Sequence, residues 1–374
     1  MAQQHWQVHP ETGFLLYPQP LAQLTTDTFP APPATIEAVE KAAENLTTWV
    51  VNQQANSLLQ ALQAIDWQTI QCDSIRPLAL ERLFMLYGYF ASAWIHGFSK
   101  SRLPSSIAQP FTAIAKQVQR PPMLSYAGQV LGNWELKNPD AGFAPENIVL
   151  LQTFTELLDE SWFFRVHIAI EAQSGTMLYD LSRVNTAVDA ENDMAVLEVL
   201  RTLQDGLVQI TKTFHRMPDL CDPDIYHQDM RPYLMSFDKT VVFEGLKDNP
   251  TPLRGGSGAQ SSVVPALIAG LNIEHESTEL IHSLMDMQRY MPLEHRDFIQ
   301  HMRQIRLRDY CKTRPHLADA YNHVLRQLMT FRRAHLYYAK AYIFAKSTNP
   351  TGTGGTAFMS FLSKLIDETS EFML

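Results

Sequence analysis

A histidine lies within an apolar stripe of one predicted helix, in the stretch FRRAHLYYAKAYIF at residues 331–344. The members of the stripe recur at three- and four-residue steps, which is one face of an α-helix: Leu328, Phe331, His335, Tyr338 and Tyr342. An imidazole in such a stripe can be a core side chain hydrogen bonded to a backbone carbonyl. It can also be an axial ligand to haem, because haem needs an apolar slot between helices and neutral imidazole binds its iron. The stripe alone leaves both interpretations of His335 open.

Two polar features accompany this histidine. Arg332 lies one helical turn earlier on the same side of the helix, where it could pair with a haem propionate or remain a solvated surface arginine. The glycines of GTGG, residues 352–355, precede an apolar periodic segment that predicts a helix. Glycines let backbone N–H groups converge, so this loop is either an anion-binding nest behind a helix N-terminus or a hinge. The sequence has no GxxxxGK[ST] motif, so a nucleotide phosphate is not the indicated anion.

A second glycine cluster, RGGSGAQSS at residues 254–262, precedes the apolar segment VVPALIAGL. Its small residues permit a close backbone approach to a flat ligand, and they are equally compatible with a plain loop. The histidine stripe and the two glycine clusters are together more specific than any one of them.

Helices must position these features, because the hydrophobic periodicity is helical along nearly the whole chain. TIEAVEKAAENLTTWVVNQQANSLLQAL predicts a helix with Thr35 as its N-cap, and PLALERLFMLYGYFASAWIHGF predicts a core helix that begins at Pro77. Further helices are predicted by ESWFFRVHIAIEAQSG, MAVLEVLRTLQDGLVQITKTFHR, SVVPALIAGL, TELIHSLMDMQRY and PHLADAYNHVLRQLMTFRRAHLYYAKAYIF. The strand signal amounts to little more than KTVVFEG. The sequence therefore predicts an all-α fold.

Length and composition limit the classes of function. A chain of 374 residues, 45% of them hydrophobic, can bury a large core and is expected to form two lobes. Its formal net charge of −9 argues against nonspecific nucleic-acid binding, which depends on Lys and Arg neutralising phosphates. The three cysteines are scattered singly, so neither a disulfide framework nor a CxxC-type zinc site is indicated. The first residues lack a secretory signal, and no apolar run approaches the roughly 18 residues of a bilayer span, so we expect a cytoplasmic protein with no membrane partner.

With these features in place, the sequence resembles the indoleamine 2,3-dioxygenase family of haem proteins, a branch of the tryptophan dioxygenase superfamily. The resemblance rests on FRRAHL, GTGGT and GGSGAQSS, and it extends from PPMLSYAGQVLGNW to the C-terminal helix. It implies a two-lobed helical haem dioxygenase fold, with a smaller N-terminal domain (1–154) that covers the distal pocket and a larger haem-binding domain (155–374). It also implies haem b as the cofactor, and O₂ and an indole or tryptophan-like molecule as the substrates.

The resemblance further implies roles for residues that match the family's motifs. His335 matches the proximal iron ligand, Arg332 matches an arginine that meets a propionate, and the loop over the haem is matched by Gly256, Ser257 and Gly258. In YHQDMRPYL, Tyr226 matches an aromatic that packs on the substrate, and Arg231 matches an arginine that holds the amino-acid carboxylate. Thr353 matches a threonine that helps to bind that carboxylate. The remaining matches to the substrate pocket are Tyr126, Phe163, Phe164 and Leu234.

His167 departs from the usual pattern of this family. Many members carry a serine there, whereas the related tryptophan dioxygenases use a distal histidine that hydrogen bonds the indole N–H. Because Phe163, Phe164 and His167 are three and four residues apart, we expect the imidazole on the face of the pocket aromatics. There it would either act in catalysis or merely fill the distal cavity. His227, beside Tyr226, is a second polar departure.

The implied reaction is oxidative cleavage of the indole C2–C3 bond with incorporation of both oxygen atoms, which gives N-formylkynurenine from L-tryptophan. The alternatives are an indole oxygenase or rearrangement enzyme of secondary metabolism, a haem-based gas sensor or carrier, and a helical interaction protein without a cofactor. Arg231 and the GTGG nest favour the enzymes, because a gas carrier has no need for a carboxylate clamp.

Overall fold

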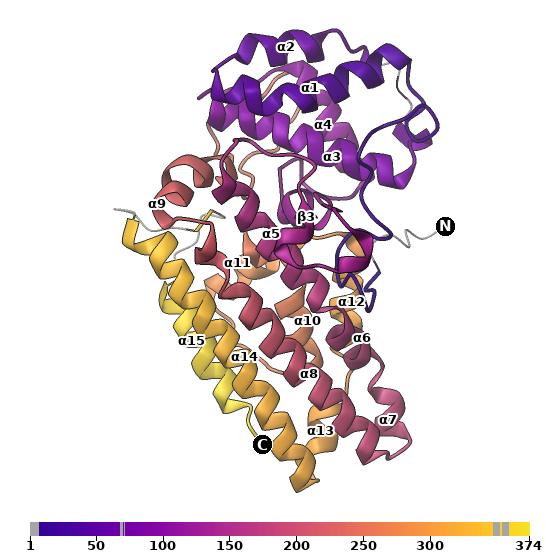
Figure 1. The fold of residues 1–374 in the computed structure, drawn as a ribbon, viewed down its shortest axis with the longest axis vertical. Coiled ribbons are helices and arrows are strands. Elements are labelled where there is room, and N and C mark those ends of the chain that lie inside the picture. Colours follow the sequence, from indigo (N-terminus) through magenta and orange to yellow (C-terminus); the bar gives the residue numbers. More distant parts are fainter. Residues whose placement is uncertain (1–6, 68–69, 71, 347–351, 354–358) are drawn as a thin grey trace.

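The fold is all-α, which confirms the prediction from helical periodicity. A computed structural model describes residues 7–67, 70, 72–346, 352–353 and 359–374, and 64% of the chain is helical. Figure 1 shows a smaller lobe built from the N-terminal helices and a larger, elongated lobe that contains the rest of the helices and the C-terminus. Within the described ranges, no helix is both long enough and apolar enough to cross a bilayer.

Four helices form the smaller lobe: α1 (Pro33–Val51), α2 (Ala55–Gln63), α3 (Pro77–Ser92) and α4 (Ser105–Gln117). Both α1 and α3 start with a proline, whose fixed φ suits the first helical turn. The expectation that Thr35 caps α1 was wrong, because the helix already begins at Pro33 and Thr35 is buried inside it. Most of α3 is buried, which confirms the core helix predicted from Pro77 onward.

Two long helices, α8 (Asp193–Phe214) and α14 (Pro315–Tyr342), run side by side through the larger lobe (Figure 1). Asp193 at the start of α8 pairs with Arg314 just before α14, and Phe214 at the end of α8 contacts Tyr338, so the two helices are parallel. The other helices of this lobe are α5 (Leu158–Gln173), α6 (Gly175–Arg183), α7 (Asn185–Asp189), α9 (Pro223–Ile225), α10 (Val263–Gly270), α11 (Glu279–Met287), α12 (Leu293–Met302), α13 (Leu307–Lys312) and α15 (Met359–Glu371).

Single helical turns connect these helices. The π turns are η4 (Ala93–Gly97), η5 (Ala127–Leu131) and η9 (Tyr226–Met230). The 3₁₀ turns are η3 (Cys72–Ser74), η6 (Pro139–Ala141), η7 (Pro145–Asn147), η8 (Met217–Asp219), η10 (Arg231–Leu234), η11 (Gly258–Gln260), η12 (Gln288–Tyr290) and η13 (Phe344–Lys346). π turns are rare in proteins and occur often at functional sites. Here η5 and η9 begin beside or at residues of the predicted substrate pocket, Tyr126 and Tyr226.

The strands in the described part of the chain are two residues long. β1 (Arg102–Leu103) pairs in parallel with β4 (Val242–Phe243), with Arg102 opposite Val242 and Leu103 opposite Phe243. β2 (Glu135–Leu136) pairs antiparallel with β3 (Ile148–Val149), with Glu135 opposite Val149 and Leu136 opposite Ile148. The predicted strand in KTVVFEG is therefore present as β4, although it serves only to tie a connecting segment to the smaller lobe.

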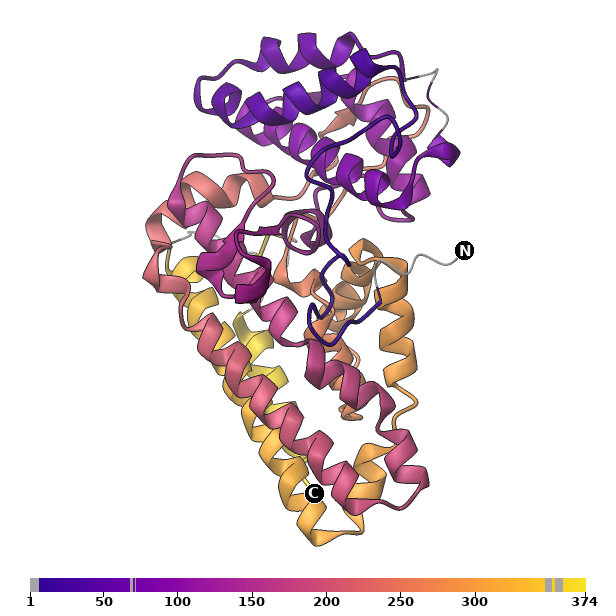
Figure 2. The same cartoon turned by 45° about the vertical axis from the view of Figure 1, so that its right-hand side comes forward.

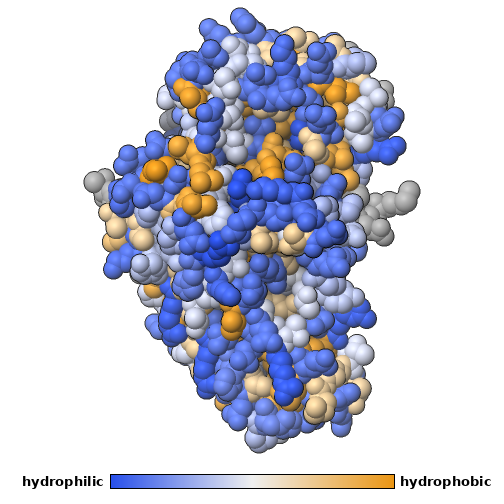
Figure 3. All heavy atoms as spheres, in the orientation of Figure 1, coloured by the Kyte–Doolittle hydropathy of each residue, from blue (hydrophilic) through white to orange (hydrophobic). Residues whose placement is uncertain are grey.

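Two hydrophobic cores correspond to the two lobes. One is built mainly from residues 24–124, and residues 237–253 return to it from the larger lobe. The other contains residues 14–16 and 126–148 as well as the long helices. The N-terminal chain thus runs from the larger lobe to the smaller one (Figure 2). On the face drawn in Figure 3, hydrophobic residues gather near the level where the lobes meet. The division into 1–154 and 155–374 stays a prediction, since each core also takes residues from the other side of it.

Candidate functional site

His335 lies on α14, next to Phe214 of α8. Its side chain is exposed, yet the surrounding protein desolvates the imidazole and lowers its pKa to about 4, with His167 and Arg332 adding to the shift. Within the described residues, neither ring nitrogen of His335 has a hydrogen-bond partner. The imidazole is therefore neutral at pH 7, with a nitrogen lone pair available to a ligand.

Phe214 connects His335 to a second histidine, His167 of α5. The Phe214 ring centroid lies 6.2 Å from that of His335 and 6.2 Å from that of His167. His167 also contacts Phe163 one turn earlier, at 4.5 Å between ring centroids, and Phe163 lies 4.8 Å from Tyr226. The structure therefore brings both histidines into one cluster of aromatic rings, although they are far apart in the sequence.

The tautomer of His167 follows from its hydrogen bond. Its Nδ1 lies 2.8 Å from the carbonyl oxygen of Phe163, and a carbonyl can only accept, so Nδ1 carries the proton and donates. Burial lowers the pKa of His167, so the ring stays neutral at pH 7. Nε2 is therefore left as a hydrogen-bond acceptor within the aromatic cluster.

The predicted pocket aromatics occupy different layers. Tyr126 is buried just before η5 and meets His167 edge-on, at 6.2 Å between ring centroids. Tyr226 packs between Phe163 and Tyr342, at 4.8 and 5.6 Å between centroids. Phe164 is fully buried, and its one aromatic contact among the described residues is an edge-on contact with Phe163. Phe163 thus belongs to the aromatic wall beside His167, whereas Phe164 packs behind it.

Arg231 and Leu234 belong to η10, which directly follows the π turn that carries Tyr226. Arg231 is half-buried, and desolvation lowers its pKa while the nearby Tyr226 hydroxyl raises it. Burial raises the pKa of Tyr226, with Arg231 opposing that rise. The guanidinium and the phenol are thus neighbours at the aromatic wall. Leu234 is buried in the core of the larger lobe.

The two glycine loops meet in the structure. The Thr353 hydroxyl donates to the carbonyl oxygen of Gly256 at 2.6 Å, and Ser236 donates to the carbonyl oxygen of Thr353 at 2.8 Å. Gly255 must be a glycine, since a Cβ there would lie 2.0 Å from the carbonyl oxygen of Leu234. Ser257 caps η11, and a Cβ on the following Gly258 would meet nothing within 4 Å. Residues 354 and 355 of GTGG lie outside the described residues.

Arg332 makes a different set of contacts from the one expected. Its guanidinium is buried and donates to Thr369 and to the carbonyl oxygen of Leu365, both on α15, while His275 Nε2 lies 3.2 Å away. Burial lowers the pKa of Arg332 to about 10, and Glu368 of α15 opposes that shift. The contacts in the structure therefore link α14 to the C-terminal helix, and the pairing of Arg332 with a propionate stays a prediction.

Several residues of the site carry no signal in the sequence. Phe214 ends α8 and is one apolar residue among many, yet its ring contacts both histidines. Gln260, within the second glycine cluster, accepts from the Tyr126 backbone N–H at 2.9 Å and donates to Gly255. Glu171 follows His167 by one turn of α5 and accepts a hydrogen bond from Ser261. These contacts join segments that only the tertiary fold brings together.

The residues around His335 fit a haem. A haem needs one neutral axial imidazole and apolar neighbours, and these requirements are met by His335 and by Phe214 and Phe331. No group of three or more His, Cys, Asp and Glu side chains comes together as a metal site in the described part of the chain. A porphyrin supplies four ligands itself, so this donor set suits haem iron better than a metal held by protein ligands alone.

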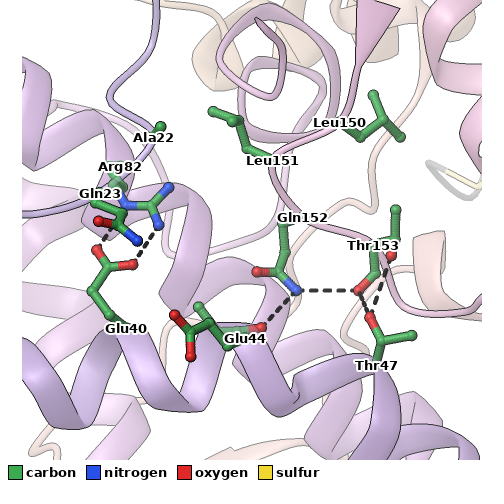
Figure 4. A pocket seen from close by; sticks show the side chains of 11 residues that line it. Ala22, Gln23, Glu40, Glu44, Thr47, Arg82, Leu150, Leu151, Gln152 and Thr153 are labelled. Carbon is green, nitrogen blue, oxygen red and sulfur yellow. Dashed lines mark hydrogen bonds and ion pairs between the residues drawn. The ribbon is translucent and has the colours of Figure 1, made fainter.

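A polar cavity of about 240 Å³ lies elsewhere, between α1 and residues 150–153 (Figure 4). It contains the ion pair of Glu40 with Arg82, and the Thr47 hydroxyl donates to the carbonyl oxygen of Thr153. None of the predicted site residues lines it. We therefore regard it as a separate feature of the smaller lobe.

Comparison with known proteins gives a consistent result. A model of the indoleamine 2,3-dioxygenase family matches residues 2–351. Similar proteins include the indoleamine 2,3-dioxygenase 1 of Mus musculus, which is 30% identical over 97% of this chain and 94% of its own length. The indoleamine 2,3-dioxygenase 2 of Homo sapiens is 28% identical, covering 90% and 92%. A 6-hydroxytryptophan 2,3-dioxygenase of Fusarium equiseti is 26% identical, covering 95% and 88%. This chain therefore belongs to the indoleamine 2,3-dioxygenase family of haem-dependent dioxygenases.

Proposed function

We propose that this protein inserts both atoms of O₂ across the indole C2–C3 bond of L-tryptophan, giving N-formylkynurenine. The observation that carries the proposal is the pair of neutral histidines, His167 and His335, which both contact Phe214 in one cluster of aromatic rings. His335 would hold the haem, and the bound haem supplies the redox-active iron that activates O₂. The protein supplies the orientation of the indole and a site without bulk water.

His167 would orient the indole ring. Its Nε2 is an acceptor because Nδ1 donates to Phe163. The N–H of an indole is a hydrogen-bond donor and would donate to Nε2. A hydrogen bond at this point fixes the rotation of the ring in its plane, and Phe163 and Tyr226, which contact each other, would pack against it from one side. Correct placement of C2 and C3 lowers the entropic part of the barrier.

Arg231 would bind the amino-acid carboxylate. A desolvated guanidinium gains more from a carboxylate partner than an exposed one, and burial lowers the pKa of Arg231 in the free protein. Thr353 is a less direct partner, because its one hydroxyl proton is already used on the carbonyl oxygen of Gly256. A carboxylate could accept that proton only by displacing Gly256.

A second candidate function is oxidation of a ring-hydroxylated or otherwise modified indole. His227 Nδ1 is buried and has no hydrogen-bond partner among the described residues, and it adjoins Tyr226 of the aromatic wall. A hydroxyl on the benzene half of an indole is one group that could satisfy such an atom. The similarity to a 6-hydroxytryptophan 2,3-dioxygenase supports this candidate as well.

The test begins with the absorption spectrum of the purified protein after incubation with haem. Wild type and a His323→Ala variant should show a ligated Soret band, whereas His335→Ala should lose it or weaken it severely. His323 is a suitable control, since it lies on the same helix and, within the described residues, its 2.7 Å hydrogen bond is to the Asp319 carbonyl. An unchanged spectrum for His335→Ala would refute this ligand.

An oxidation assay in air, with a reductant present, then identifies the substrate. Wild type should convert L-tryptophan to a formylkynurenine product with incorporation of two ¹⁸O atoms from ¹⁸O₂. Preference for 6-hydroxytryptophan would favour the second candidate. Haem binding without oxidation of L-tryptophan, 6-hydroxytryptophan or indole would leave a gas-binding protein.

A further inference from the structure

A buried acid, Glu171, lies behind the wall of the site that His167 and Tyr126 form. It is one turn beyond His167 on α5 and is fully buried. The Ser261 hydroxyl donates to its Oε1 at 2.6 Å, and the Tyr126 hydroxyl is near enough to the carboxyl to lower its pKa. Its Oε2 is buried and makes no hydrogen bond of ordinary geometry within the described residues.

These contacts join three parts of the site. Glu171 belongs to the helix of the distal histidine, Tyr126 belongs to the aromatic wall, and Ser261 ends the glycine loop that follows Arg254. A second tie runs in parallel, because the Tyr126 N–H donates to Gln260 of the same loop. The loop is thus held to the distal wall by one backbone contact and by one carboxyl.

We propose that Glu171 is a positioning residue of this site, which holds the glycine loop and Tyr126 against the helix of His167 while it is protonated and loosens them when it is charged. The proposal rests on the proposed function only in its consequence for turnover. The contact itself is a property of the folded chain.

The physical reason is the cost of an isolated buried charge. Desolvation raises the pKa of Glu171 to about 7, and the hydrogen bonds from Ser261 and Tyr126 oppose that rise without overcoming it. Burial costs a neutral carboxyl little free energy. A buried carboxylate is destabilised, and it becomes more stable if the loop moves and water reaches it. Proton loss therefore favours opening of the tie between the loop and α5.

Other groups near Glu171 do not account for the same titration. Burial and Glu171 raise the pKa of Tyr126, and burial lowers the pKa of His167, so both titrations are moved away from pH 7. The remaining titratable residues on packed segments are His295, which contacts Ser262, and His9 and Glu11 of the N-terminal turn that covers the Glu171 backbone. The variants below separate Glu171 from these residues.

The first measurement is the melting temperature of the protein as purified, from pH 5 to pH 8.5. A folded-state pKa above the unfolded value means that the contribution of Glu171 is greatest at low pH and is lost as pH rises through about 7. Glu171→Gln keeps the shape and removes the titration. The melting temperature of wild type should therefore fall relative to this variant by roughly 5 °C between pH 5 and pH 8.

The second measurement is hydrogen–deuterium exchange of peptides covering residues 254–262, corrected for the intrinsic pH dependence of exchange. In wild type the protection should fall at least about threefold from pH 6 to pH 8, since loss of the proton favours opening. In Glu171→Gln the corrected protection should stay constant.

Glu160 provides a matched control. It is a second fully buried acid on α5 whose pKa burial raises to about 7, but it accepts from Phe154 and Thr155, away from the glycine loop. Glu160→Gln should change the melting curve in the same sense and leave exchange at 254–262 as in wild type. Ser261→Ala removes a hydrogen bond that lowers the pKa of Glu171, so it should move the midpoint of both effects to higher pH.

Parallel melting curves for wild type and Glu171→Gln would overturn the proposal. So would exchange at 254–262 that keeps its pH dependence in Glu171→Gln or loses it in Glu160→Gln. If Glu171→Gln does not fold, the direction of the shift in Ser261→Ala decides. Neither measurement needs turnover, so failure of the proposed function would appear separately, as an absence of indole oxidation.

Discussion

At the scale of single residues, the two histidines differ in the role that their ring nitrogens suit. Both rings are kept neutral by desolvation. His335 has no hydrogen-bond partner in the described part of the chain, which suits a metal ligand. His167 is fixed by its bond to Phe163 with Nε2 as an acceptor. An acceptor can bind an indole N–H, whereas it makes no hydrogen bond with a ring that is methylated at nitrogen.

The role of His167 is therefore testable with two substrates. His167→Ala should lower kcat/KM for L-tryptophan about two- to tenfold, which corresponds to the roughly 0.5–1.5 kcal/mol of one neutral hydrogen bond. The haem spectrum should persist. Turnover of 1-methyltryptophan, which has no N–H to donate, should be nearly equal in the two proteins. Equal losses on both substrates would leave His167 as a packing residue.

Arg231 should distinguish substrates by their carboxylate. A hydrogen bond to a charged group contributes roughly 1.5–3 kcal/mol, so Arg231→Ala should raise the KM for L-tryptophan about ten- to hundredfold. The KM for indole should hardly change, because indole has no carboxylate. Equilibrium binding to the haem-loaded protein, followed by absorption, checks both. A similar loss of affinity for indole would mean that Arg231 supports the pocket and does not bind the carboxylate.

At the scale of elements, α14 joins the site to the C-terminal helix. One side of α14 presents His335, and Arg332 on the preceding turn binds α15 through Thr369. Behind this contact, His275 lies 2.5 Å from Glu368, whose negative charge also raises the pKa of Arg332 against the effect of burial. Since Arg332 is buried, it needs this partner, and α15 is therefore fixed to the helix that carries the predicted iron ligand.

Removal of the anion from this cluster should be costly. Glu368→Ala removes the carboxylate that lies 2.5 Å from His275 and whose charge acts on the buried Arg332, and loss of a buried partner costs roughly 1–3 kcal/mol of unfolding free energy, or more for a charged group. Lys364→Ala is the control, since Lys364 is exposed and its pairs with Glu276 and Glu368 should contribute little. Urea denaturation of the two variants gives both values. Equal stabilities would show that α15 is not held in this way.

At the scale of the whole molecule, a buried amide network connects the two lobes. Asn133, after η5, is fully buried and donates to the Tyr89 hydroxyl of α3 at 2.9 Å and to the carbonyl oxygen of Gln152 at 2.9 Å. It also accepts from the Gln152 N–H at 2.8 Å. One side chain thus contacts both the smaller lobe and the segment that leads to α5, the helix of His167.

Asn133→Ala should therefore destabilise the protein as a whole. The change leaves buried polar groups of Tyr89 and Gln152 unsatisfied, at roughly 1–3 kcal/mol for each group. Asn45→Ala is the control, because Asn45 is half-buried and, within the described residues, its side chain bonds the Lys41 carbonyl of its own helix. Urea unfolding followed by tryptophan fluorescence measures both. A loss no greater than that of Asn45→Ala would show that the network does not couple the lobes.

The sequence alone determined the fold class and the positions of the main chemical groups along the chain. The spacing of apolar residues predicts helices because it follows from backbone geometry over a few turns, and the all-α fold confirms it. The same local pattern placed His335 on an apolar face, and the motifs around it led to the family that the comparison confirms. Thr35 was the exception, because a proline before it provided a better first turn.

Only the tertiary structure decided what those groups meet. Phe214 contacts both His167 and His335 because α8 packs against both α5 and α14, a relation that no local periodicity encodes. The same holds for Arg332, whose partners lie on α15, and for Glu171, whose partner lies in the glycine loop. Periodicity records which face of a helix is buried. The identity of the neighbour depends on how all the helices pack together, and so do the desolvation and the hydrogen bonds that set each side chain's protonation state.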